Sequence, residues 1–311
     1  RRISMLTGEY SKVSLIVPIF NVEPYLEESL DSIACQTYQN FEVIMIDDGS
    51  TDSSGVIAKS FVTKDSRFQY IKTENKGQSH ARNIGLGQVQ GELIAFVDPD
   101  DSIEKDFLRK LVNQFDNDTL IVSYLFPSAR PNKHKGKVTV DIFFSLMFSG
   151  VIGTVVWNKI FRTELLHGVR FPEGQVHEEI EFFREILPLI NDYQMVIIND
   201  NNHYNYRTVR EGNTASTFQP NRLVGAQDAF KLLLDLKSMK KKQSVEIINL
   251  DTLVFLKNYI QKVNNVELKK DASSLFNELY LHTNIIKCFF IKPIWLLSVI
   301  RFRFKLRWKN G

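Results

Sequence analysis

The chain has 311 residues, of which 43% are hydrophobic and 24% charged, and its formal net charge is +3. This composition is typical of a folded protein with a full core, and so small a charge argues against nucleic acid as a partner. The two cysteines, Cys35 and Cys288, are too few for a disulfide framework or a cysteine-based zinc site, and they suit a reducing, cytoplasmic compartment. Residues 1–10 lack the apolar core of a signal peptide, and no apolar run approaches the ~18 residues of a membrane span.

Short apolar runs alternate with amphipathic stretches over the first 110 residues. Strands are predicted at residues 13–18, 41–46, 68–71 and 93–97, and a helix follows each of the first three, the last of them ending at Gly91. Further strands are predicted at residues 120–126 and 195–198, and the basic segment 130–137 is expected to be a solvated surface connection. Strands that alternate with helices at this spacing indicate an α/β fold, with a mostly parallel sheet covered by helices on both faces.

Three carboxylates follow the strand predicted at residues 93–97. Open α/β sheets bind their ligands at the carboxyl ends of the strands, and two carboxylates in Asp-x-Asp spacing can hold one Mg²⁺ or Mn²⁺ together with phosphate oxygens. Asp101 and Glu104 fit a capping box for the next helix. Asp98 and Asp100 therefore remain as candidates for binding a ligand or a metal.

Glycine-based phosphate sites are missing from the sequence. No Gly-x-Gly-x-x-Gly follows the first strand, and no Walker loop occurs. A domain of this kind that binds phosphates must use a metal and basic side chains instead. Carboxylates at the strand ends can accept hydrogen bonds from a base and a ribose.

Four motifs carry a resemblance to a known family. They are residues 17–21, 47–52, 75–77 with 81–85, and 98–101. In order and spacing they resemble the motifs of family 2 glycosyltransferases, strongly over the first 110 residues and more weakly to about residue 215. The resemblance implies a Rossmann-like GT-A fold and transfer of a sugar from a nucleotide-diphospho-sugar, most simply a UDP-sugar.

The resemblance also implies roles for six residues at the donor site. Pro18 and Asp48 would lie against the nucleobase, Asn75 and Arg82 would support the base and diphosphate, Asp98 would contact the ribose, and Asp100 would bind Mn²⁺ or Mg²⁺.

Two adjacent carboxylates, Glu178 and Glu179, begin another predicted helix. The helix macrodipole favours anions in the first turn, which explains both of them structurally. The family usually has Glu-Asp here, with the second residue as general base, so the resemblance implies that Glu179 is the base. Glutamate in place of aspartate is a departure from the family pattern, and Glu178 stays the alternative.

A stretch near residue 205 resembles the family's Tyr-Arg segment close to the diphosphate. His203 or Arg207 could neutralise the leaving group there, and His203 is a second candidate for the metal. A strand with one exposed face would explain His203 equally well. The polar segment 211–217 could close over the donor as a lid.

The chain changes character near residue 219. We expect residues 1–218 to form the glycosyltransferase domain, with a nucleotide-sugar half at about 11–110 and an acceptor half at about 111–218, and residues 219–311 to form a helical region. Its tail, residues 285–308, interleaves aromatic and basic side chains. That pattern suits an anionic membrane surface at the inner face of the cell membrane. A helix packed on the domain, or a homo-oligomer contact, would produce the same pattern.

The sequence thus predicts an inverting, metal-dependent hexosyltransferase. Its acceptor would be a hydroxyl of a growing surface glycan, lipid-linked or protein-linked. The Gln-x-x-Arg-Trp motif of processive synthases is missing, so one sugar is expected per encounter. Two alternatives stay open: a sugar-phosphate nucleotidyltransferase, and a non-catalytic scaffold with a degenerate site.

Overall fold

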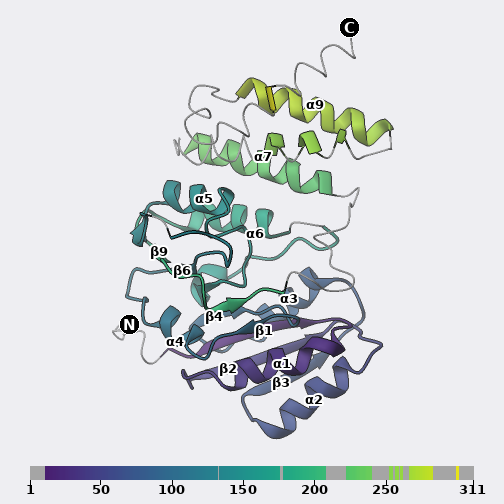
Figure 1. Ribbon diagram of the computed structural model, residues 1–311, viewed down its shortest axis with the longest axis vertical. Coiled ribbons are helices and arrows are strands. Elements are labelled where there is room, and N and C mark those ends of the chain that lie inside the picture. The colour runs from purple at the N-terminus through teal and green to yellow at the C-terminus, as the bar shows by residue number, and fades with distance from the viewer. Residues whose placement is uncertain are drawn as a thin grey trace.

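The computed structural model describes residues 11–131, 133–175, 178–207, 222–239, 252–254, 256–258, 260–261, 266–282 and 299–300. At its centre is an eight-stranded sheet of order β3-β2-β1-β4-β8-β6-β9-β7 (Figure 1). Its strands are β1 (Val13–Ile19), β2 (Phe41–Asp47), β3 (Phe68–Lys72), β4 (Leu93–Phe96), β6 (Ile121–Tyr124), β7 (Gly136–Val138), β8 (Lys159–Arg162) and β9 (Met195–Ile198). A small second sheet pairs β5 (Ser102–Ile103) with β10 (Tyr204–Asn205).

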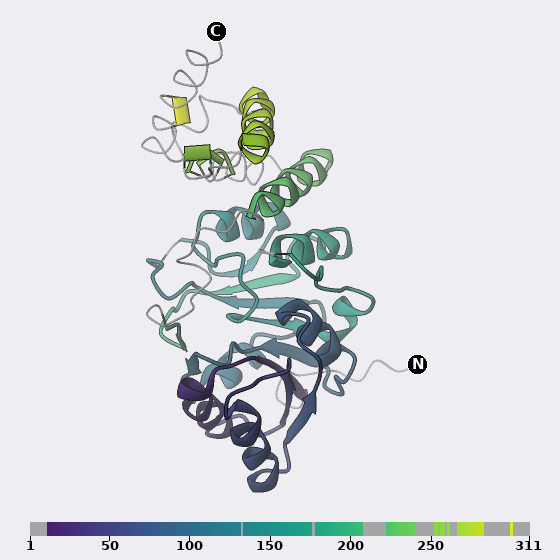
Figure 2. The ribbon, with the colours of Figure 1, turned by 90° about the vertical axis from the view of Figure 1, so that its right-hand side faces the viewer.

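The described helices include those that cover both faces of the large sheet and two that lie beyond them (Figures 1 and 2). They are α1 (Glu23–Ala34), α2 (Ser54–Lys64), α3 (Gln78–Leu86), α4 (Phe107–Val112), α5 (Val140–Phe148), α6 (Glu178–Ile186), α7 (Arg222–Ser238) and α9 (Val266–His282), with short 3-10 turns at Thr163–Leu166 and Leu187–Leu189. Strands β1 to β4 are parallel, β8 runs antiparallel between β4 and β6, and β9 is parallel to β6. The predicted mostly parallel α/β sheet is confirmed.

Alternation along β1 shows why both faces are covered. Leu15 and Val17 pack with Leu26 of α1, in a core that also includes residues of α2 and α4. The residue between them, Ile16, points to the opposite face and packs in the core formed with α5 and α6. Successive side chains of a strand face opposite sides, so an unbroken apolar strand needs helices on both.

The C-terminal helices extend the second core. Leu232 and Leu236 of α7 and Phe276 of α9 belong to the same cluster as Phe182 of α6. Figures 1 and 2 show α7 lying over α6, with α9 beyond it at the far end of the molecule. The predicted lid at 211–217 and the tail at 285–308, apart from residues 299–300, lie outside the described residues. Within the described part of the chain, no helix has the length and apolarity to span a membrane.

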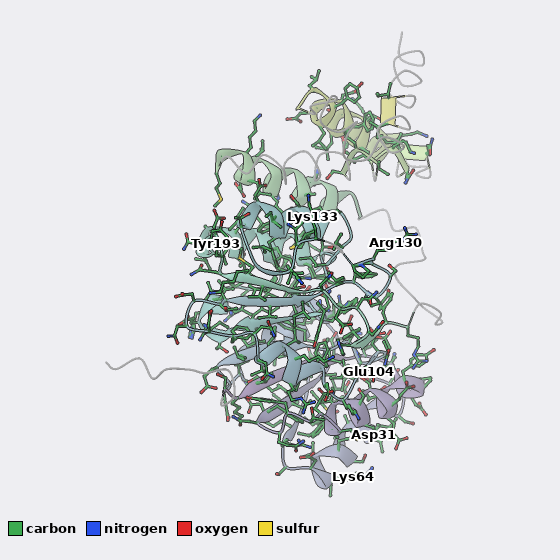
Figure 3. All side chains as sticks on the ribbon, turned by 60° about the vertical axis from the view of Figure 1, so that its left-hand side comes forward. Asp31, Lys64, Glu104, Arg130, Lys133 and Tyr193 are labelled. Carbon is green, nitrogen blue, oxygen red and sulfur yellow. The ribbon has the colours of Figure 1, made fainter. Side chains whose placement is uncertain are left out.

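Two local predictions were wrong. Residues 102–103 form β5, so α4 begins only at Phe107, and Asp101 and Glu104 do not form its capping box. Helix α3 ends at Leu86 rather than at Gly91. Gly91 is instead needed at the start of β4, because a Cβ there would overlap the carbonyl of Lys12. The basic segment is a surface connection only in part: Arg130 and Lys133 are exposed (Figure 3), but Gly136 and Lys137 belong to β7, which pairs with β9.

Candidate active site

Polar side chains gather where β1, β2 and β4 end. These strands are parallel neighbours, so their carboxyl ends lie at one edge of the sheet. Asp47 ends β2, Asp48 follows it, and Asp98 comes shortly after β4. This is the edge at which open α/β sheets bind ligands.

Asp48 holds the segment that contains Asn75. Its Oδ1 accepts a hydrogen bond from the backbone N–H of Lys76 at 3.0 Å, and its Oδ2 accepts one from the N–H of Gly77 at 2.7 Å. Gly49 has a φ of 79°, and a Cβ there would lie 3.0 Å from the backbone nitrogen of Asn75. The predicted donor residues Asp48 and Asn75 are therefore brought together, with the Asn75 side chain exposed.

The end of β1 exposes an aromatic ring. Pro18 is buried in the strand, beyond Ile16, where the pairing of β1 with β4 ends. Phe20 is 44% exposed, and Asn21 turns the chain away with a φ of 49°. Its Oδ1 accepts the N–H of Thr51 at 2.9 Å, which ties the first motif to the second. Phe20 was not predicted as a site residue, although its place directly after a buried strand was a usable signal.

Asp47 is a buried carboxylate that holds the turn after β2 at the same edge of the sheet. Its carboxylate is fully buried and accepts hydrogen bonds from the Tyr70 hydroxyl at 2.6 Å and the Ser50 N–H at 2.7 Å. Burial alone would raise the pKa of Asp47, but these hydrogen bonds outweigh it and lower the pKa. Asp47 thus stays ionised and shapes the turn after β2.

Arg82 of α3 connects the carboxyl edge of the sheet, where β1, β2 and β4 end, to α6. Its side chain is 1% exposed, and its Nη2 donates to Oδ1 of Asp98 at 3.0 Å. Its Nη1 donates to Oε1 of Glu178 at 2.9 Å and lies 3.7 Å from Oε1 of Glu179. Burial would lower the pKa of Arg82, but the three carboxylates raise it. The predicted site residue is therefore a buried cation shared by carboxylates that are far apart in sequence.

The two adjacent glutamates have different surroundings. Glu178 is 5% exposed, and its Oε1 accepts hydrogen bonds from both Arg82 and Gln78. Glu179 is 18% exposed. Burial and the neighbouring Glu178 raise the pKa of Glu179 to about 8, against the opposing charge of Arg82. Glu178 is thus held by its hydrogen bonds with Arg82 and Gln78, whereas Glu179 is the more accessible carboxylate.

Asp100 and Asp101 lie beside Arg207. Both are buried; the carbonyl of Asp100 accepts Nε–H of Arg207 at 3.0 Å, and Oδ1 of Asp101 accepts its backbone N–H at 2.8 Å. The guanidinium also pairs with Glu28 at 2.8 Å. Burial raises the pKa of Asp101 to about 7, against hydrogen bonds from the Arg207 backbone and the Tyr204 side chain, which act to lower it. Asp101, assigned to a cap from sequence, is instead part of this cluster.

His203 contacts a different set of residues. Its imidazole Nε2 is 2.7 Å from Oδ2 of Asp200 and 2.9 Å from Nζ of Lys110, and its ring packs on Tyr124. The next residue, Tyr204, has its hydroxyl 3.1 Å from the N–H of Asp98. Neighbouring residues of an extended chain face opposite sides. Tyr204 thus faces Asp98, whereas the contacts of His203 are with Asp200 and Lys110.

The carboxylates suit a cation that shares its coordination with substrate. The described residues contain no group of three or more His, Cys, Asp or Glu arranged to hold a metal. Mg²⁺ and comparable cations commonly take only one or two carboxylates, with water and substrate phosphate completing the shell. Asp100 supplies a buried carboxylate at this place, and Asp98 lies two residues before it in the same segment. The donor set therefore fits such a cation.

A sheet of this order with carboxylates along its carboxyl edge defines a GT-A glycosyltransferase. The chain belongs to glycosyl transferase family 2, whose family model matches residues 14–170. It is 34% identical to glycosyltransferase GlyA of Streptococcus pneumoniae over 54% of this chain and 27% of GlyA. It is 30% identical to the poly(ribitol-phosphate) beta-N-acetylglucosaminyltransferase TarS of Staphylococcus aureus over 77% of this chain and 41% of TarS. The chain thus spans less than half of either relative.

Solved structures show the same fold. A crystal structure of S. aureus TarS 1-349 in complex with UDP-GlcNAc matches 86% of this chain and 81% of its own, with a TM-score of 0.69 and 26% identity. The mannosyltransferase PcManGT of Pyrobaculum calidifontis, in complex with GDP-Man and Mn²⁺, matches 94% of this chain and 87% of its own, with a TM-score of 0.58 and 18% identity. The predicted family and fold class are confirmed.

Proposed function

We propose that this chain is an inverting glycosyltransferase that moves a sugar from a UDP-sugar to an acceptor hydroxyl. The observation that carries the proposal is the contact of one buried arginine, Arg82, with both the carboxylate that follows β4 and the carboxylates that begin α6. A donor bound at the carboxyl edge would thus lie next to a candidate base. The UDP-GlcNAc complex of TarS supports UDP as the nucleotide.

The donor site is formed by the residues brought together at the ends of β1, β2 and β4. Phe20 offers an exposed ring on which a base can stack, and Asp48 and Asn75 offer acceptors and donors at its edge. Arg207 already lies beside Asp100 and is a cation for the diphosphate. Asp98 retains carboxylate oxygen for the ribose while it pairs with Arg82.

Glu179 is proposed as the general base. It takes the proton of the acceptor hydroxyl, and the oxygen attacks the anomeric carbon on the face opposite the diphosphate. The bond between that carbon and the diphosphate oxygen breaks, and UDP leaves with the electron pair. Because this is one displacement, an α-linked donor gives a β-linked product. A base titrating near the working pH is the most effective, and the raised pKa of Glu179 meets that condition.

A divalent cation, Mn²⁺ or Mg²⁺, would be held by Asp100. When bound, such a cation neutralises negative charge on the diphosphate of the departing nucleotide. The Mn²⁺ complex of PcManGT is consistent with this assignment. The acceptor is proposed to be a hydroxyl of a growing glycan, in keeping with the acceptor in the name of TarS.

The test is release of UDP from a panel of UDP-sugars, with Mn²⁺, Mg²⁺ and EDTA arms. We expect slow, EDTA-sensitive release from one donor, and we expect Asp100→Asn to lose the metal-dependent part. Asp118→Asn, on an exposed turn, is the matched control and should behave as wild type. If no donor is hydrolysed and neither UDP nor another nucleoside diphosphate raises the melting temperature in the presence of Mn²⁺, the proposal is wrong.

A further inference from the structure

Lys159, at the start of β8, is a fully buried lysine that the proposed reaction does not use. Its Nζ donates to the carbonyl oxygens of Ile152 at 3.0 Å, Gly153 at 3.0 Å and Val155 at 2.7 Å. A fourth acceptor, Oδ1 of Asn158, lies at 2.8 Å. An unpaired ammonium is costly inside a protein, so this ring of acceptors is what allows the lysine to be there.

Asn158 holds the same segment from its other side. Its side chain is fully buried, and Nδ2 donates to the carbonyl of Ile152 at 3.0 Å and to the carbonyl of Tyr124 at 3.1 Å. Gly153 has a φ of 62°, and a Cβ there would lie 2.9 Å from Cδ2 of Phe126. Residues 152–155, here called the carbonyl loop, are therefore fixed by two buried side chains and by close packing.

The carbonyl loop lies on the side of α6 that carries the proposed base. Glu179 and Phe183 are four residues apart and share one face of the helix. The ring of Phe183 has its centroid 5.6 Å from Nζ of Lys159. Burial lowers the pKa of Lys159 well below its ordinary value, while the nearby negative charge of Glu179 acts to raise it. The lysine thus lies between the loop and the base helix.

The neighbouring Trp157 faces the carboxyl edge of the sheet, where β1, β2 and β4 end. Its ring stacks on Tyr204 at 4.1 Å, and the Tyr204 hydroxyl contacts the N–H of Asp98. The ring of Trp157 is also parallel to that of the half-buried Tyr206, with the centroids 5.5 Å apart. Three consecutive side chains, of residues 157–159, therefore connect the carbonyl loop, the β4 carboxylates and the base helix.

We propose that the carbonyl loop is the wall on which the acceptor saccharide rests beside Glu179, and that Lys159 is the positioning residue that sets this wall. The loop is half exposed at residues 153–155, so it can face a substrate, while the carbonyls of residues 152, 153 and 155 point to the lysine. The proposal rests on the proposed function, since it presupposes sugar transfer. It adds an acceptor-side element to a site otherwise defined by the donor.

Arg162, at the other end of β8, offers a matched control. It is also a buried cation that donates to backbone carbonyls, those of Thr119 at 3.0 Å and Asp116 at 2.6 Å. Those carbonyls precede β6, at the opposite end of the strand from Lys159. Lys159→Met and Arg162→Met remove the same kind of interaction from one strand, but only the first faces the base helix.

The experiment compares donor binding with transfer. UDP affinity in Mn²⁺ is measured by calorimetry. Transfer of the sugar is measured to a panel of p-nitrophenyl glycosides, and hydrolysis of the donor by water, which needs no acceptor saccharide, is measured separately and should change little. We expect Lys159→Met to keep UDP affinity within about twofold and to lower the transfer rate by on the order of 10²-fold, the cost of misplacing reacting groups by about 1 Å. Arg162→Met should lower only the melting temperature. Gly153→Ala, which displaces the loop and leaves the lysine, should also lower transfer, and it decides the matter if Lys159→Met does not fold.

Equal losses of transfer in Lys159→Met and Arg162→Met would overturn the proposal. So would a loss of UDP affinity in Lys159→Met that is large enough to explain its entire loss of transfer. Normal transfer in Gly153→Ala would also count against it. A wild-type chain that neither binds UDP nor releases it from any donor would contradict the proposed function instead, so the two failures are distinguishable.

Discussion

Arg82 and Asp98 form an ion pair at 3.0 Å that links α3 to the end of β4, and the same guanidinium reaches α6. The pair places a permanent positive charge among three carboxylates, on a guanidinium that is itself buried. Electrostatic interactions are strong in such surroundings, so Arg82 is expected to influence both stability and the protonation of the base.

Arg82→Met is expected to destabilise the protein by about 3–5 kcal/mol, because breaking a buried pair leaves carboxylates without a counter-charge. Thermal or urea unfolding would measure this loss. Arg109→Met is the control, since Arg109 pairs with Asp106 on the surface and should change stability little. Equal stability of the two variants would show that Arg82 is not an essential counter-charge.

Glu179→Gln is expected to lower transfer by about 10²–10⁴-fold, the usual contribution of a general base, with UDP affinity retained. UDP release and calorimetry on the same preparation would separate the two effects. Glu178→Gln removes a framework carboxylate and should chiefly lower the melting temperature, because it weakens contacts with Arg82 and Gln78. The reverse pattern would move the base by one residue.

Activity is expected to depend on pH through Glu179. A carboxyl group can accept a proton only when ionised, and the pKa of Glu179 is raised to about 8 by burial and by Glu178. The rate constant kcat/KM should therefore rise as pH increases from 6 towards 9 and level off above the pKa. A profile flat from pH 6 to 9 would contradict the assignment.

Gly49→Ala is expected to lower both stability and UDP affinity. The positive φ of 79° is strained for alanine, at about 1–2 kcal/mol, and the new Cβ would press on the backbone of Asn75. Gly168 has a similar φ of 83°, and a Cβ added there would meet nothing within 4 Å, so Gly168→Ala isolates the backbone cost. If both variants bind UDP like wild type, the segment at Asn75 does not contribute to the donor site.

Much of the donor half could be predicted from sequence because its signals are local. Apolar runs bounded by turn residues located β1, β2, β3 and β4, and the parallel arrangement placed their carboxyl ends together. Asp101 shows the limit of such reasoning. Its spacing to Glu104 matches a capping box, but the residues between them pair with β10 from the far end of the domain. A contact across about a hundred residues leaves no local pattern.

The order of short motifs by itself determined the family and the sheet, because these depend on local apolar periodicity and on the residue types at strand ends. Only the tertiary structure decided how the charges are shared. Arg82 and Glu178 are 96 residues apart, and their contact depends on how α3 and α6 pack over the sheet. The same packing buries Lys159 against its ring of carbonyls and leaves Glu179 more accessible than Glu178. Desolvation and pairing are properties of the packed molecule, so the chemical roles of these side chains emerge only there.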